Sequence, residues 1–97
     1  MLYKIGELKR LVQPIAQKHG VKKVSIFGSY GRGEATSQSD VDICIDKGDM
    51  RSLLEIISFQ QDVEEALNLP VDVVTSDIRN TEFLDKIRPD EMVLYER

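Results

Sequence analysis

Two aspartates at alternate positions, Asp40 and Asp42, open a short apolar segment that runs to Ile45. Side chains of a β-strand alternate between its two faces, so both carboxylates are expected on one face, while the apolar residues face a core. Two carboxylates held side by side repel each other unless a cation lies between them. Hard oxygen ligands of this kind suit Mg²⁺, which in turn binds phosphates. The pair therefore predicts a magnesium site beside a phosphate.

A Gly-Ser turn precedes this pair, with ten residues between Ser29 and Asp40, and it follows an apolar segment at 22–27. Backbone N–H groups at such a turn can hold a phosphate. Gly28 allows a close approach of the backbone, and Ser29 adds a hydroxyl donor. Arg32 could pair with a phosphate through its fork of N–H donors, or it could be a solvated surface arginine. A nucleotide with its metal is the expected occupant.

A third acid, Asp72, lies inside the apolar segment 71–75. Burying an unpaired carboxylate in a strand costs free energy, so an acid at such a position is expected to have a partner or a function. It could face water on an edge strand, or pair with a lysine. Together with Asp40, Asp42 and the Gly-Ser turn, we favour a third carboxylate that meets the other two across adjacent strands. Three carboxylates holding two Mg²⁺ would permit in-line displacement at phosphorus, and Asp72 could also take the proton of the attacking hydroxyl.

The elements that must position these residues alternate along the chain. Apolar residues at helical spacing predict a helix from Ile5 that stops at Gly20, and a longer helix over 50–67 that ends at Asn68. The expected inner face of the longer helix is Leu53, Leu54, Ile57, Val63 and Leu67. Strands are predicted at 22–27, 41–45, 71–75 and 92–95, and short helices near 30–35 and 83–87. This order predicts an α/β (α+β) fold, in which helices pack on a small mixed β-sheet, as a single domain over residues 1–97.

The composition limits the classes of function. The chain has 97 residues, 41% of them hydrophobic and 31% charged, which is typical of one small globular domain. A net charge of −4 argues against non-specific binding to nucleic acid or to anionic membranes. No apolar run approaches the roughly 20 residues of a membrane span. The only cysteine, Cys44, is expected to be a buried inert thiol, and a cytoplasmic location is expected. The only histidine, His19, is expected at a helix end and not in catalysis.

These motifs together resemble a known family. Gly28-Ser29, Asp40-Val41-Asp42 and the later Asp72 are similar to the signature of the DNA polymerase β-type nucleotidyltransferase superfamily. The run from Phe27 to Ala35 and the small size resemble its minimal nucleotidyltransferase (MNT) branch. The resemblance covers essentially the whole chain and implies the nucleotidyltransferase fold.

The resemblance also implies an activity. It implies Mg²⁺-dependent transfer of AMP from ATP, with Asp40, Asp42 and Asp72 as catalytic residues and metal ligands. It implies Gly28 and Ser29 as phosphate holders, and Arg32 is added as a candidate nucleotide contact. Members of this branch are often antitoxins that inactivate HEPN toxins by adding AMP to a tyrosine, so a HEPN-type toxin is the expected partner.

Two other functions stay open. The same fold could serve as a non-catalytic module that binds a partner or senses a nucleotide. It could also act on a small molecule of the aminoglycoside type, although no acceptor domain remains once the catalytic core has used the 97 residues. For the same reason the acceptor must be held by a partner protein, by a second copy of the chain or by an exposed groove.

Overall fold

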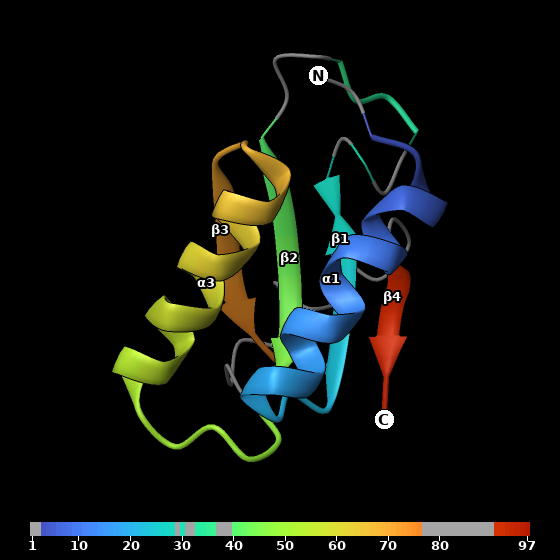
Figure 1. The fold of residues 1–97 in the computed structure, drawn as a ribbon. Helices are drawn as coiled ribbons and strands as arrows, with labels where there is room; N and C mark the ends of the chain where they lie inside the picture. The colour runs from blue at the N-terminus through green and yellow to red at the C-terminus, as the bar shows by residue number, and fades with distance from the viewer. Residues whose placement is uncertain (1–2, 29, 31–32, 37–39, 77–90) are drawn as a thin grey trace.

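The computed structural model describes residues 3–28, 30, 33–36, 40–76 and 91–97, and it shows a four-stranded sheet with helices packed on one face (Figure 1). The elements in chain order are α1 (Ile5–His19), β1 (Lys23–Phe27), β2 (Val41–Asp46), α3 (Leu53–Leu67), β3 (Val71–Thr75) and β4 (Met92–Glu96). The predicted strands and both long helices are confirmed, with small shifts at their ends. Of the short helix predicted at 30–35, Tyr30 is helical, residues 33–35 are not, and 31–32 lie outside the described residues; the helix predicted at 83–87 lies wholly outside them.

The sheet is mixed and has the strand order β3-β2-β1-β4. Strand β1 pairs antiparallel with both β2 and β4. Strand β3 pairs parallel with β2, and α3 makes the crossover between them. This arrangement confirms the predicted fold class, and it makes β3 and β4 the edges of the sheet.

Helix α1 begins and ends where its sequence predicts. The carboxylate of Glu7 accepts a hydrogen bond from the N–H of Lys4 at 3.1 Å, which satisfies one of the free donors of the first turn. At the other end Gly20 adopts φ +71°, a left-handed conformation that closes the helix. The buried stripe of α1 consists of Leu8, Val12 and Ala16.

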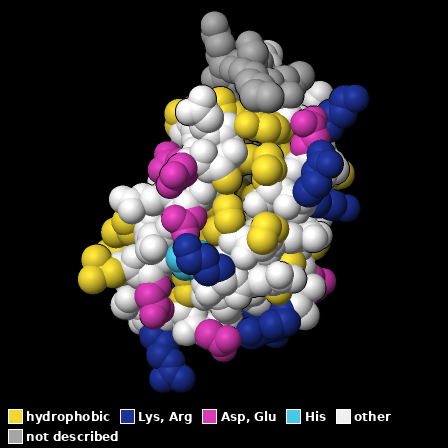
Figure 2. Space-filling model, in the orientation of Figure 1, with side chains coloured by type: hydrophobic (Ala, Val, Ile, Leu, Met, Phe, Trp, Pro, Cys, Tyr) yellow, Lys and Arg dark blue, Asp and Glu magenta, His cyan; other side chains and the backbone are white. Residues whose placement is uncertain are grey.

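Helix α3 differs from its prediction in its start and in its inner face. It begins at Leu53, because the hydroxyl of Ser52 accepts from the N–H of Glu55 at 3.3 Å and caps the helix. The buried stripe is Phe59, Val63 and Leu67. The assignment of Leu53, Leu54 and Ile57 to the inner face is wrong, since these side chains are 70%, 76% and 39% exposed. Followed backwards at helical spacing, the stripe reaches Ile56, which packs on the core. Apolar side chains are accordingly visible at the surface over the first turns of α3 (Figure 2).

The core lies between the helices and the sheet. From the two central strands it takes Val24, Ile26, Val41, Ile43 and Ile45, none of which is exposed. Their neighbours in sequence point to the other face of the sheet, because side chains alternate along a strand. This alternation separates a packed face from a face that carries polar groups.

Two tyrosines, Tyr3 and Tyr30, complete the core. The hydroxyl of Tyr3 donates to the carbonyl of Leu67, so it ties the start of the chain to the end of α3. Tyr30 packs in the core with 4% exposure. Its hydroxyl is buried and has no hydrogen-bond partner among the residues that the structure describes. Among the described residues there is no helix with the length and apolar character needed to cross a membrane.

Candidate functional site

Asp42 and Asp72 are aligned across the parallel strands β2 and β3. On its other side Asp42 pairs with Phe27, the last residue of β1. Both aspartates belong to the face of the sheet that α1 and α3 leave uncovered, since Val41, Ile43 and Val71 face the helices. Neighbouring strands run about 4.8 Å apart, so the two acids are direct neighbours. The structure therefore brings together two of the three predicted carboxylates.

The backbone of Gly28 touches the carboxylate of Asp42. A Cβ atom added to Gly28 would lie 2.4 Å from Oδ2 of Asp42, closer than side chains tolerate. Gly28 also has φ +69°, a conformation that L residues with a side chain rarely adopt. Only glycine fits both conditions. Gly28 thus lies against Asp42, one acid of the pair, at the end of β1.

Asp40 lies just outside this arrangement. It is exposed and precedes the first residue of β2, whose N–H donates to the carbonyl of Pro70 at 3.1 Å. Within the part of the chain that the structure describes, no three His, Cys, Asp or Glu side chains are close enough to hold a metal ion together. The backbone therefore aligns Asp42 with Asp72. The side chains of Asp40, Asp42 and Asp72, in the conformations that the structure shows, do not form a three-carboxylate cluster.

Two of the predicted site residues, Ser29 and Arg32, lie outside the described residues. Their predicted contacts with a phosphate stay predictions. The flanking residues Gly28 and Tyr30 are described and fix where the turn leaves the sheet.

The same face of the sheet carries a small cavity of about 170 Å³ beyond the acid pair. It is lined by Lys23, Ser25, Cys44, Ile45, Asp46, Ser76 and Glu91. Burial raises the pKa of the Cys44 thiol, and the carboxylate of Glu91 adds to the effect. A thiol with a raised pKa is a poor nucleophile, and the prediction that Cys44 is buried is confirmed.

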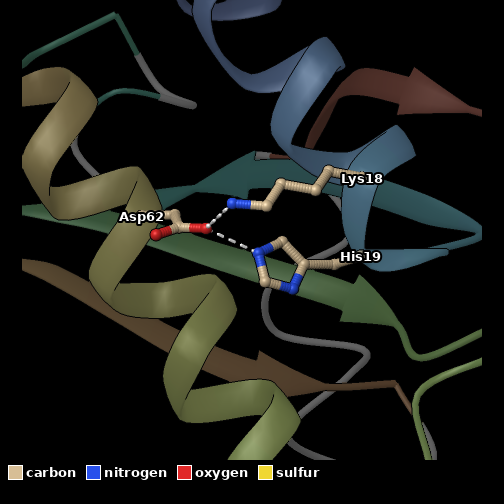
Figure 3. Close-up of polar contacts among 3 residues, drawn as sticks. All are labelled: Lys18, His19 and Asp62. Atoms are coloured by element: carbon tan, nitrogen blue, oxygen red, sulfur yellow. Dashed lines mark hydrogen bonds and ion pairs between the residues drawn. The ribbon is translucent and has the colours of Figure 1, made fainter.

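His19 joins the two helices and has no part in the acid-bearing face. Its Nε2 atom lies 2.7 Å from Oδ2 of Asp62, and Nζ of Lys18 lies 3.2 Å from the same oxygen (Figure 3). The imidazole also packs edge-on against Phe59, with 5.7 Å between ring centroids. These hydrogen bonds, that of His19 first, lower the pKa of Asp62. The sequence predicts a helix-end role for His19, but it gives no signal for a partner on another helix.

A larger cavity, of about 490 Å³, also lies in the helix layer. It is lined by Pro14, Ile15, Lys18, Asp62, Glu65 and Ala66. Because it opens on the opposite side of the sheet from Asp42 and Asp72, we do not assign it to the chemistry of the acid pair.

Comparison with known proteins identifies the family to which this chain belongs. Residues 9–97 match the family model described as polymerase beta, nucleotidyltransferase. A protein of Methanocaldococcus jannaschii, provisionally named a protein adenylyltransferase, is 48% identical over 71 residues, which are 73% of this chain and 76% of the relative. The protein adenylyltransferase MntA of Thermococcus cleftensis is 43% identical over 60 residues, 62% of this chain and 61% of that protein.

Solved structures share the fold. A minimal nucleotidyltransferase superposes with a TM-score of 0.78 at 25% identity, covering 93% of this chain and 95% of the other. An MNT antitoxin in complex with the tri-AMPylated HEPN toxin of Shewanella oneidensis gives 0.70 at 17% identity, covering 93% and 71%. The family model spans nearly the whole chain and includes the Gly28 turn and all three aspartates. The chain therefore belongs to the polymerase β-type nucleotidyltransferase family.

Proposed function

We propose that this nucleotidyltransferase transfers AMP from ATP to a hydroxyl of a partner protein, a tyrosine of a HEPN-type toxin, and thereby acts as an antitoxin. The observation that carries the proposal is the alignment of Asp42 with Asp72, directly against the backbone of Gly28. The names of the relatives support it, because they include a protein adenylyltransferase and an antitoxin bound to an AMPylated toxin.

Each residue of the site has a proposed role. Asp42 and Asp72 offer the hard oxygen donors that Mg²⁺ prefers, and Asp40 would join them once its carboxylate turns toward the pair. Bound there, Mg²⁺ would supply charge neutralisation for the phosphates. The Gly28-Ser29 turn would hold the triphosphate through backbone N–H groups, and Arg32 would pair with a phosphate oxygen.

Asp72 is proposed to face the acceptor. It is exposed and lies on the edge strand β3, where a hydroxyl from another protein can approach it. In the transfer, the acceptor oxygen bonds to the α-phosphorus of ATP and the bond to pyrophosphate breaks. Asp72 takes the proton that the hydroxyl releases, and pyrophosphate leaves with its charge.

The acceptor would be supplied by another polypeptide. The helices cover one face of the sheet, and the acid pair lies on the other. A partner docked over that face would place its hydroxyl at Asp72, in a hetero-oligomer, while a second copy of this chain would do so in a homo-oligomer. A cytoplasmic setting, in which ATP is present, belongs to the same proposal.

The second candidate is a non-catalytic module that silences its partner by binding alone. One observation favours it: among the described residues the carboxylates do not form a cluster that could hold a metal. A transferase for small molecules of the aminoglycoside type has no comparable observation in its favour.

Intact-mass spectrometry of the toxin separates these functions. Incubated with this protein, ATP and Mg²⁺, the toxin is expected to gain one or more AMP units. Chelation of Mg²⁺ or Asp72→Asn should abolish the gain, while Asp46→Asn should not, because Asp46 lies about 13 Å further along the same face of β2 than Asp42. A toxin that is silenced without any gain in mass, and equally by the Asp72→Asn variant, would establish the binding module instead.

A further inference from the structure

The start of β3 is held by two side chains of α3, at the residue directly before Asp72. Nε2 of Gln60 donates to the carbonyl oxygen of Val71 at 2.7 Å. The N–H of Val71 donates to Oε2 of Glu64 at 3.2 Å. Gln60 and Glu64 are four residues apart, so they lie one above the other on the same side of the helix. Both polar groups of one strand residue are thus bound by one helix.

These bonds occupy the outer edge of the sheet. Strand β3 has β2 as its neighbour on one side only. It bonds β2 through alternate residues: the carbonyl of Pro70 accepts from Val41, and the N–H of Ser76 donates to the carbonyl of Ile45. In a parallel pair, only every second residue of a strand bonds the neighbouring strand, and here these are the even-numbered residues from Pro70 to Ser76. Val71 is odd-numbered, so its N–H and C=O point away from β2. Gln60 and Glu64 therefore bind where a further strand would otherwise pair.

The two bonds connect an edge strand to a fixed support. Parallel pairing is slightly weaker per residue than antiparallel pairing, and the first residues of an edge strand are the ones that separate most easily. Helix α3, in contrast, is anchored in the core by Phe59, Val63 and Leu67. A bond from this helix to Val71 therefore limits how far the next residue can shift along or away from β2.

We propose that Gln60 and Glu64 are positioning residues that hold Asp72 at the height of Asp42. The proposal rests on the proposed function of the acid pair. It states that α3, on the opposite side of the sheet, keeps the two carboxylates correctly placed relative to each other. Transfer at phosphorus depends on placing groups correctly, and a misplacement of 1 Å can lower a rate by about 100-fold. Loss of either bond should therefore lower the rate of the chemical step more than the binding of ATP, which the Gly28-Ser29 turn would hold from β1.

Three variants separate positioning from simple support of the fold. Gln60→Met keeps the length of the side chain and removes the donor to Val71. Glu64→Gln keeps an oxygen that can accept from the N–H of Val71, so it is the conservative replacement. Gln61→Met makes the same chemical change as Gln60→Met at the adjacent exposed position, and it is the matched control.

The first measurements are hydrogen exchange of the amides of β3 and the kinetics of AMP transfer, at a temperature where all variants are fully folded. In Gln60→Met we expect faster exchange at Val71 and Asp72, a kcat lower by about 10- to 100-fold and a nearly unchanged KM for ATP. Glu64→Gln and Gln61→Met should resemble the wild type in all three. Wild-type exchange in Gln60→Met, or faster exchange with a wild-type kcat, would overturn the proposal.

A second measurement does not depend on catalysis. The carboxyl ¹³C resonance of Asp72 should respond to Asp42→Asn, because the two carboxylates are direct neighbours. The response should be weaker when Gln60→Met is also present. If the wild type transfers no AMP, the proposed function fails, yet this response still tests the positioning. An equal response with and without Gln60→Met would refute it, whatever the activity.

Discussion

Replacing Gly28 by alanine should separate the stability of the Gly-Ser turn from the chemistry of the site. The new Cβ would lie 2.4 Å from Oδ2 of Asp42, while ordinary van der Waals contact begins at 3.4 Å. The carboxylate must therefore move by about 1 Å, which is a displacement on the order of that known to lower rates by about 100-fold. Because that oxygen belongs to a side chain and not to the backbone, the displacement should cost less free energy of unfolding than a clash with the backbone would.

Gly33→Ala is the matched control for backbone strain. Gly33 has φ +74°, close to the +69° of Gly28, but a Cβ at Gly33 would meet no atom within 4 Å. A left-handed conformation costs a residue with a side chain about 1–2 kcal/mol. Both variants should lose about this amount of unfolding free energy, and only Gly28→Ala should also lose about 100-fold in the rate of transfer, which corresponds to about 2.7 kcal/mol of transition-state stabilisation.

Urea unfolding gives the two free energies, and single-turnover transfer of AMP to the partner, at saturating ATP and Mg²⁺, gives the two rates. A folded Gly28→Ala variant that transfers AMP as fast as Gly33→Ala would show that the contact of Gly28 with Asp42 does not set the geometry of the reaction. An equal loss of rate in both variants would assign the effect to strain in the turn instead.

Three further outcomes are expected. Tyr30→Phe should be neutral or raise the free energy of unfolding, by up to about 1–3 kcal/mol, since the buried hydroxyl has no partner among the described residues; a clear loss in urea unfolding would show that it has one. The lowered pKa of Asp62 means that its bonds to His19 and Lys18 stabilise the fold above the ordinary carboxyl value near 4, and that this stability is lost as pH falls through the lowered pKa. The thermal stabilities of the wild type and Asp62→Asn should therefore converge at acid pH, and a difference that persists there would contradict the assignment. Cys44 should react with a thiol reagent slowly in the native protein and rapidly in urea, and rapid labelling of the native protein would contradict its burial and raised pKa.

The alternation of polar and apolar residues was sufficient to predict the strands and the direction in which Asp42 and Asp72 point. Parallel alignment of β2 with β3 then follows from the intervening helix, which leaves few other arrangements. The inner face of α3 was not predicted correctly, because Leu53, Leu54 and Ile57 offer a second apolar stripe that only the position of the sheet can reject.

Contacts between distant polar residues gave no local signal. Asp62 bonds His19 from 43 positions away, and Gln60 binds the backbone of Val71, a contact that any polar side chain of that length could make. Side-chain direction set a further limit: spacing places Asp40 and Asp42 two residues apart on one strand face, but it does not say whether their carboxylates and that of Asp72 converge on one point.

The crossover from β2 through α3 to β3 has a consequence for how the protein reaches its active form. Asp42 and Asp72 are adjacent in the sheet, but they are 30 positions apart in the chain. Their contact closes a loop, and its entropy must be lost before the parallel ladder can compensate for it. The hairpin of β1 and β2 requires a shorter closure and can form first, so Gly28 and Asp42 can meet while β3 is still unpaired. During refolding, protection of the β1 and β2 amides should precede protection of the β3 amides, and recovery of activity should follow the later phase.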